Sequence, residues 1–113
     1  MSRITIRNAD GKWTVRAGGA VLGESAAALE LTEGEHPFVI YFPKDDLAMA
    51  FLELTDHRTT CPQKGEASYY SIVTKSKTIV NAAWSYETPI EDVSRIAGYI
   101  AFHASDEVAI EHI

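Results

Sequence analysis

Apolar and polar residues alternate in short segments from the start of this chain. Residues 3–7 (RITIR) and 12–16 (KWTVR) both alternate with period two, which is the pattern of a half-buried β-strand. Asp10-Gly11 lies between them and predicts a hairpin turn. Gly18-Gly19 predicts the next turn, before a strand around residues 20–22. A chain that begins in this way is expected to fold as a β-sheet protein.

Segments of the same kind recur along the rest of the chain. Residues 37–42 (PFVIYF) combine β-branched and aromatic side chains and are predicted to form a central strand. Residues 27–31 and 47–54 are compatible with helix or strand, and strand is favoured for both. The remaining predicted strands are residues 68–73, 78–86, 99–102 and 108–113, the first two forming a hairpin around Lys75-Ser76-Lys77.

One segment carries the signals of a helix. Residues 88–91 (TPIE) place threonine at the N-cap, proline at the first helical position and glutamate three residues after the cap. Ile90, Val93 and Ile96 then fall on one face, which predicts a short helix near residues 89–97. With about eight short, mostly antiparallel strands, the prediction is a mainly β roll in which residues 1–113 form a single domain.

Charge and composition argue against several classes of function. Ten Lys and Arg residues against sixteen Asp and Glu residues give a net charge of −6, so nucleic acid is not an expected partner, because phosphate binding needs basic residues. No apolar run approaches the ~20 residues that cross a bilayer, so no membrane association is expected. Cys61 is the single cysteine and the N-terminus lacks a leader pattern, which together predict a cytoplasmic location.

No metal and no cofactor are predicted. The four histidines are scattered singly and one cysteine cannot complete a ligand pair, whereas structural zinc sites use closely spaced pairs. Neither a Gly-x-Gly-x-x-Gly motif nor a P-loop is present.

The stretch 59–71 (TTCPQKGEASYYS) concentrates several chemistries between two predicted strands. It holds a hydroxyl, a thiol, an ammonium and a carboxylate, carried by Thr60, Cys61, Lys64 and Glu66. Pro62 fixes its own φ and Gly65 permits a positive one, so we expect a rigid loop that can present backbone amides to a ligand.

Aromatic residues accompany this loop. Tyr69, Trp84 and Tyr86 lie on two strands that are expected to pair, with Trp84 and Tyr86 on the same face and Tyr69 opposite to Tyr70. Each candidate has an ordinary alternative. Cys61 is typical of a small, half-buried side chain, Lys64 of a solvated turn residue, Glu66 of a turn salt bridge, and the aromatic residues of core packing.

Four motifs in order along the chain resemble one family. Residues 41–46 (YFPKDD), 60–70 (TCPQKGEASYY), 83–86 (AWSY) and 96–102 (IAGYIAF) are similar to the domain-of-unknown-function family numbered 427, which some catalogues label nucleotidyltransferase-like. Gln63 departs from the family pattern, in which an aromatic or other residue often stands. The adjacent pair Asp45-Asp46 does not support the nucleotidyltransferase label, because neighbouring strand residues point to opposite faces.

The resemblance implies a small antiparallel fold similar to the β-tent domains, which include the methionine sulfoxide reductases that act on the R-sulfoxide and the ligand-binding domain of cereblon. Many β-tent relatives hold zinc with two cysteine pairs. This chain lacks those pairs, so its core alone must hold the fold.

Three functions remain open. The first is binding of a small planar or anionic ligand between residues 59–71 and 84–86, by Thr60, Lys64, Gly65, Tyr69, Trp84 and Tyr86. The second is a thiol-dependent enzyme, with Cys61 as nucleophile favoured by Lys64 and with Glu66 or His57 as a base. The third is a homodimeric interaction or structural protein in which the tyrosines serve as interface anchors.

Overall fold

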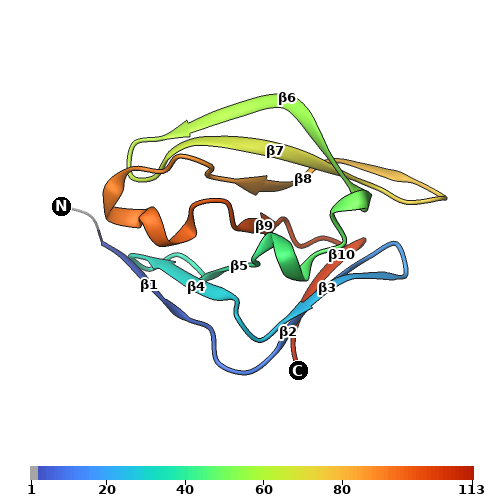
Figure 1. Ribbon diagram of the computed structural model, residues 1–113, viewed down its shortest axis with the longest axis horizontal. Helices are drawn as coiled ribbons and strands as arrows, with labels where there is room; N and C mark the ends of the chain where they lie inside the picture. The colour runs from blue at the N-terminus through green and yellow to red at the C-terminus, as the bar shows by residue number, and fades with distance from the viewer. Residues whose placement is uncertain (1–2) are drawn as a thin grey trace.

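The computed structural model describes residues 3–113, which form ten strands in three antiparallel sheets (Figure 1). Sheet A has the order β1 (Ile4–Asn8), β4 (Leu29–Glu33) and β5 (Val39–Tyr41). Sheet B has the order β10 (Val108–His112), β2 (Trp13–Ala17) and β3 (Ala20–Ser25). Sheet C has the order β6 (Leu52–Cys61), β7 (Gly65–Val73), β8 (Thr78–Ser85) and β9 (Ile100–Phe102). The predicted mainly β fold is confirmed.

The three sheets enclose the core from different sides. In Figure 1 sheet C lies across the top, with sheets A and B below it. Phe42 joins sheets A and C, because its backbone exchanges two hydrogen bonds of 2.8 Å with Ile100. Two hydrophobic clusters fill the interior. The first includes Val15, Leu22, Phe42, Ile72, Ile100 and Val108, and the second includes Leu31, Tyr41, Ala67, Val93, Ile96 and Ala101.

Sheet C is irregular near its middle, where both β6–β7 and β7–β8 shift register. Asn81 of β8 has a φ of 51°. Its side-chain oxygen accepts a 2.6 Å hydrogen bond from Thr55, and its N–H donates to the Ser71 hydroxyl at 3.1 Å. Such irregularities bend a sheet. Next to them, Tyr70 packs in the first cluster and Tyr69 against the second, which confirms that these two side chains lie on opposite faces.

The predicted hairpin at Asp10-Gly11 is wrong. β1 pairs with β4, whereas β2 pairs with β3 and β10. The connection between β1 and β2 instead runs from sheet A to sheet B. Ala9 is buried in it, and its N–H donates to the Ala28 carbonyl at 2.9 Å, which continues the β1–β4 pairing. The β2–β3 turn at Gly18-Gly19 is confirmed, with both glycines at positive φ.

Residues 3–113 also contain three short 3₁₀ segments: η1 (Lys44–Asp46), η2 (Met49–Phe51) and η3 (Glu91–Ile96). Of the strand predicted over residues 47–54, only the part from Leu52 belongs to β6. The helix predicted near residues 89–97 is η3, but its cap residue is Ile90 and no side chain caps it, so the capping role expected of Thr88 is wrong. Val93 and Ile96 are its buried residues, and their spacing of three suits the 3₁₀ period.

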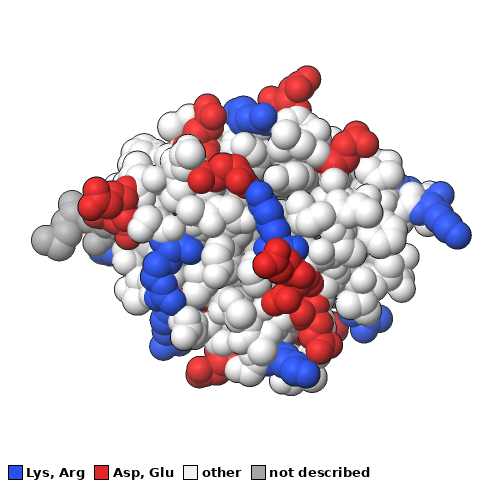
Figure 2. Space-filling model, viewed as in Figure 1, with Lys and Arg blue, Asp and Glu red and all other residues white. Residues whose placement is uncertain are grey.

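The surface carries both signs of charge. On the face shown in Figure 2, lysine and arginine side chains are interspersed with aspartate and glutamate rather than gathered in one basic patch. None of the helical segments in residues 3–113 is long or apolar enough to cross a membrane.

Candidate ligand-binding site

A cavity of about 250 Å³ lies between sheets A and C, at the end of the molecule where β6 turns into β7. Its lining combines aromatic rings with one lysine and one glutamate. The lining residues are Leu31, Glu33, His36, Pro37, Val39, Tyr41, Lys64, Tyr69, Trp84, Tyr86 and His103.

Lys64 provides the charge on one wall of this cavity. Its ammonium lies 2.7 Å from Glu33 Oε1 and 3.4 Å from Cys61 Sγ, and only 12% of its side chain is exposed. Partial burial alone lowers the pKa of Lys64, but the hydrogen bond to Glu33 and the neighbouring Cys61 outweigh it, so its pKa is raised above the ordinary value. Lys64 is therefore a protonated donor at neutral pH.

The local sequence explains how Lys64 reaches the cavity. The β6–β7 turn is closed by a 3.1 Å hydrogen bond from the Lys64 N–H to the Cys61 carbonyl, with Pro62 in the position that proline favours in such turns. Gly65 follows at a φ of 112°, which confirms the positive φ expected there. The Lys64 carbonyl accepts a 2.9 Å hydrogen bond from the Ile90 N–H, so the turn is fixed to the segment before η3.

Tyr41, Trp84 and Tyr86 form an aromatic wall. The Trp84 indole N–H donates to the Tyr41 hydroxyl at 3.3 Å, and the two rings meet edge to face with centroids 6.4 Å apart. Burial raises the pKa of Tyr41 well above its ordinary value. Burial also raises the pKa of Tyr86, although the nearby Lys64 partly opposes this. Both phenols consequently keep their protons at neutral pH and can act as hydrogen-bond donors.

His103 and Tyr69 form a second wall. The His103 ring lies 4.4 Å from the Trp84 ring at an angle of 40°, and it is parallel to the Tyr69 ring at 6.5 Å. The Tyr69 hydroxyl is 3.0 Å from the Thr59 hydroxyl, which fixes its position. Desolvation lowers the pKa of His103, so its imidazole is neutral near pH 7 and adds a ring rather than a charge.

The structure brings together four of the residues singled out in the sequence. Lys64, Tyr69, Trp84 and Tyr86 all line the cavity. Cys61 is a free, half-buried thiol in contact with Lys64, and Gly65 shapes the turn.

Two other predicted site residues lie elsewhere. Thr60 and Glu66 are directly paired across β6 and β7, and both are exposed. Their neighbour Ala67 belongs to the second cluster and their neighbour Cys61 packs against it, so alternation places Thr60 and Glu66 on the opposite face. His57, the other candidate base for Cys61, contacts Tyr69 instead, with the two ring centroids 4.5 Å apart.

Several cavity residues carry no sequence signal of their own. Glu33 is separated from Lys64 by 31 positions and Tyr41 from Trp84 by 43, and His36 and His103 are single histidines. Tyr41 belongs to a predicted strand and to the motif at residues 41–46, but neither pattern pairs it with Trp84, and no motif includes Glu33. Their convergence depends on the packing of sheet A against sheet C.

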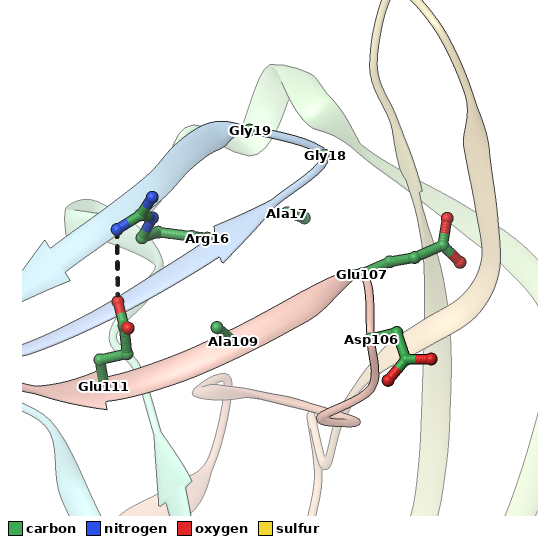
Figure 3. Close-up of a pocket in the computed structure, with 8 residues that line it drawn as sticks. All are labelled: Arg16, Ala17, Gly18, Gly19, Asp106, Glu107, Ala109 and Glu111. Atoms are coloured by element: carbon green, nitrogen blue, oxygen red, sulfur yellow. Dashed lines mark ion pairs between the residues drawn. The ribbon is translucent and has the colours of Figure 1, made fainter.

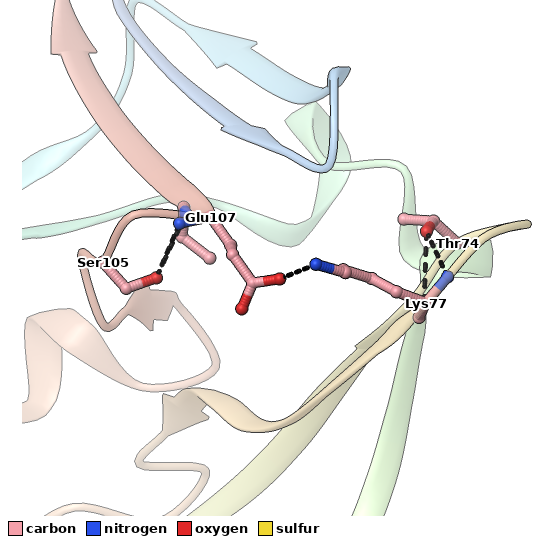
Figure 4. A network of polar contacts seen from close by, with 5 residues as sticks. Thr74, Lys77, Ser105 and Glu107 are labelled. Carbon is pink, nitrogen blue, oxygen red and sulfur yellow. Dashed lines mark hydrogen bonds and ion pairs between the residues drawn. The ribbon is translucent and has the colours of Figure 1, made fainter.

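A second depression lies at the other end of the molecule, on sheet B. Arg16 and Glu111 form an ion pair there with N and O 3.6 Å apart, and Asp106 and Glu107 also line the depression (Figure 3). Glu107 in turn pairs with Lys77 of the β7–β8 turn (Figure 4). Within residues 3–113, no three His, Cys, Asp or Glu side chains come together as a possible metal site.

The architecture and the cavity define a class: small antiparallel β proteins with an aromatic cavity between two sheets, consistent with a β-tent. Residues 5–112 match the family described as Domain of unknown function (DUF427). The chain belongs to this family, as its motifs predicted. No curated protein matches the sequence.

Proposed function

We propose that this protein binds a small planar ligand in the cavity between sheets A and C. The observation that carries the proposal is the Lys64–Glu33 pair, which faces the same cavity as the rings of Trp84, Tyr86 and Tyr69. Aromatic rings favour stacking or edge contacts with another ring. The lysine and glutamate offer one donor and one acceptor to the ligand's edge.

The size of the cavity limits the ligand. About 250 Å³ is below the ~300–1,000 Å³ typical of sites for drug-sized molecules. One or two fused rings is the size that this space supports.

The charge balance favours a planar ligand over a simple anion. The ammonium of Lys64 is already 2.7 Å from the Glu33 carboxylate, so a free anion would have to compete with Glu33. A ligand edge that accepts from Lys64 and donates to Glu33 keeps both partners satisfied. Amides, imides and nucleobases carry such edges.

The test is a thermal-shift and calorimetric screen of nucleosides, nucleotides and cyclic imides. At least one planar compound is expected to bind, and Lys64→Met is expected to weaken it about tenfold, because a charge-assisted hydrogen bond is lost. Lys77→Met is the matched control, since Lys77 also lies at a hairpin turn and pairs with a glutamate, but far from the cavity. No binding by any compound, or equal losses in the two variants, would contradict the proposal.

One observation favours a thiol-dependent activity as a second candidate. The Lys64 ammonium lies 3.4 Å from Cys61 Sγ, so a cation contacts the atom that would act as nucleophile. Iodoacetamide should then alkylate Cys61 more slowly in Lys64→Met than in Lys77→Met at pH 7. Equal rates in the two variants would remove this candidate.

A further inference from the structure

An apolar cavity of about 250 Å³ adjoins the candidate site between sheets A and C. Its walls include Trp13, Phe38, Phe102 and Ile110, and every side chain that lines it is aromatic or aliphatic. The Trp13 indole N–H donates to the Asp10 carbonyl at 3.1 Å, so the indole presents an already satisfied, apolar surface. Phe38 is 50% exposed, which leaves this apolar space open to solvent.

The two cavities share a wall. Trp84 and Val39 line both of them. The end of β9 and the residues after it alternate between the two cavities, since Phe102 and Ala104 line the apolar cavity and His103 lines the polar one. The two spaces therefore meet along the Trp84 indole.

We propose that the ligand is amphipathic, with its planar head between Lys64 and the aromatic walls and an apolar arm that passes Trp84 into the cavity beside Phe38. This inference rests on the proposed function and specifies its ligand class. The head occupies the cavity that offers a donor and an acceptor, and the arm occupies the one that offers neither. An arm of this kind would cover apolar surface on Trp13 and Phe38 that otherwise contacts water, which favours binding.

The test compares ligands that differ only in the arm. The probes are 1-methyluracil against 1-hexyluracil and 3-methylglutarimide against 3-hexylglutarimide, with dissociation constants from calorimetry. For the head that binds, the hexyl form is expected to bind at least about tenfold more tightly, because several additional methylene groups are buried. Ala104→Phe, a change at an exposed position that lines the apolar cavity, should abolish this gain.

Ala109→Phe is the matched control, since Ala109 is also exposed but lines the separate depression of Figure 3. The Ala109→Phe variant should keep the full gain in affinity of the hexyl form over the methyl form. If the methyl forms bind and the hexyl forms bind no more tightly, the arm is refuted and the proposed function stands. A gain that survives Ala104→Phe would place the arm elsewhere and overturn the inference.

Two other outcomes also overturn it. If no methyl or hexyl form binds, this inference is overturned, and the broader screen of planar compounds decides the proposed function separately. If light scattering shows a dimer that Ala104→Phe dissociates, the occupant of the apolar cavity is a second copy of the chain rather than a ligand arm.

Discussion

The turns at the two ends of β7 have the same plan. Each carries a lysine that reaches a glutamate outside sheet C: Lys64 pairs with Glu33 of sheet A, and Lys77 pairs with Glu107 just before β10 of sheet B. In Figure 1 the two turns lie at opposite ends of sheet C. Each pair thus ties one end of the sheet to a different neighbour.

Their surroundings differ. The side chains of Lys64 and Glu33 are 12% and 32% exposed, against 47% and 42% for Lys77 and Glu107. Lys64 faces an aromatic cavity, whereas Lys77 lies beside Thr74 in an open polar network (Figure 4). The same kind of ion pair thus borders a cavity at one end of β7 and is a solvated link at the other. The environment of a lysine, rather than the ion pair itself, distinguishes the candidate site.

A substitution that acts on the backbone should give the largest difference between the two turns in the free energy of unfolding. Gly65→Ala is expected to lower the free energy of unfolding by about 2 kcal/mol, because a side chain is strained at positive φ, and Gly65 has a φ of 112°. The cost is conformational rather than steric, since a Cβ there would lie no closer than 3.5 Å to its neighbours. Urea unfolding measures it.

Ser76→Ala, in the other turn, is the comparison for this change. Ser76 is exposed, and the expected change is within about 0.5 kcal/mol. Equal costs at the two turns would show that the rigidity of the Lys64 turn is not special.

The coupling free energies of the two ion pairs should differ less. In double-mutant cycles, Lys64→Met with Glu33→Gln is expected to give a coupling of about 1 kcal/mol, since the pair is partly shielded from water. Lys77→Met with Glu107→Gln should give about 0.3 kcal/mol, which 0.5 M salt largely removes. A larger coupling at the Lys77 end would reverse the distinction drawn from exposure.

Local sequence signals predicted the elements that carry the site. Alternation and β-branched content identified the strands, and the glycine at position 65 identified the turn at positive φ. The hairpin of β7 and β8 and the opposite faces of Tyr69 and Tyr70 also follow from local pattern. Each of these features depends on residues close together in the sequence.

The features that sequence reasoning missed depend on long-range packing. The Asp10-Gly11 signal is local and suits a hairpin, but Ala9 is buried and continues the pairing of β1 with the segment before β4, while β2 pairs with β3 and β10. Glu33 and Tyr41 reach the cavity only because sheet A packs on sheet C. No spacing between Lys64 and Glu33 could have indicated this, since ion pairs across sheets leave no periodic pattern.

The last expected effect is a small loss of stability at alkaline pH, which arises at the cavity end of the molecule. Burial holds the pKa of Tyr41 well above its ordinary value, so the folded protein keeps this proton after the unfolded chain begins to lose it near pH ~10. Because the unfolded chain then binds fewer protons, stability falls as pH rises above that value. Tyr41 alone should account for about 0.4 kcal/mol at pH 10.

Tyr41→Phe tests this assignment when its free energy of unfolding is compared with the wild type at pH 7 and again at pH 10. The difference between the two proteins should shift by that amount in favour of the variant, whatever the variant costs at pH 7 through the lost acceptor of the Trp84 indole. Ser76→Ala changes the other turn without changing a titrating group, and it should follow the wild-type decline. If Tyr41→Phe also follows it, the Tyr41 phenol is not shielded from water, and the description of the cavity wall as a buried, protonated donor is wrong.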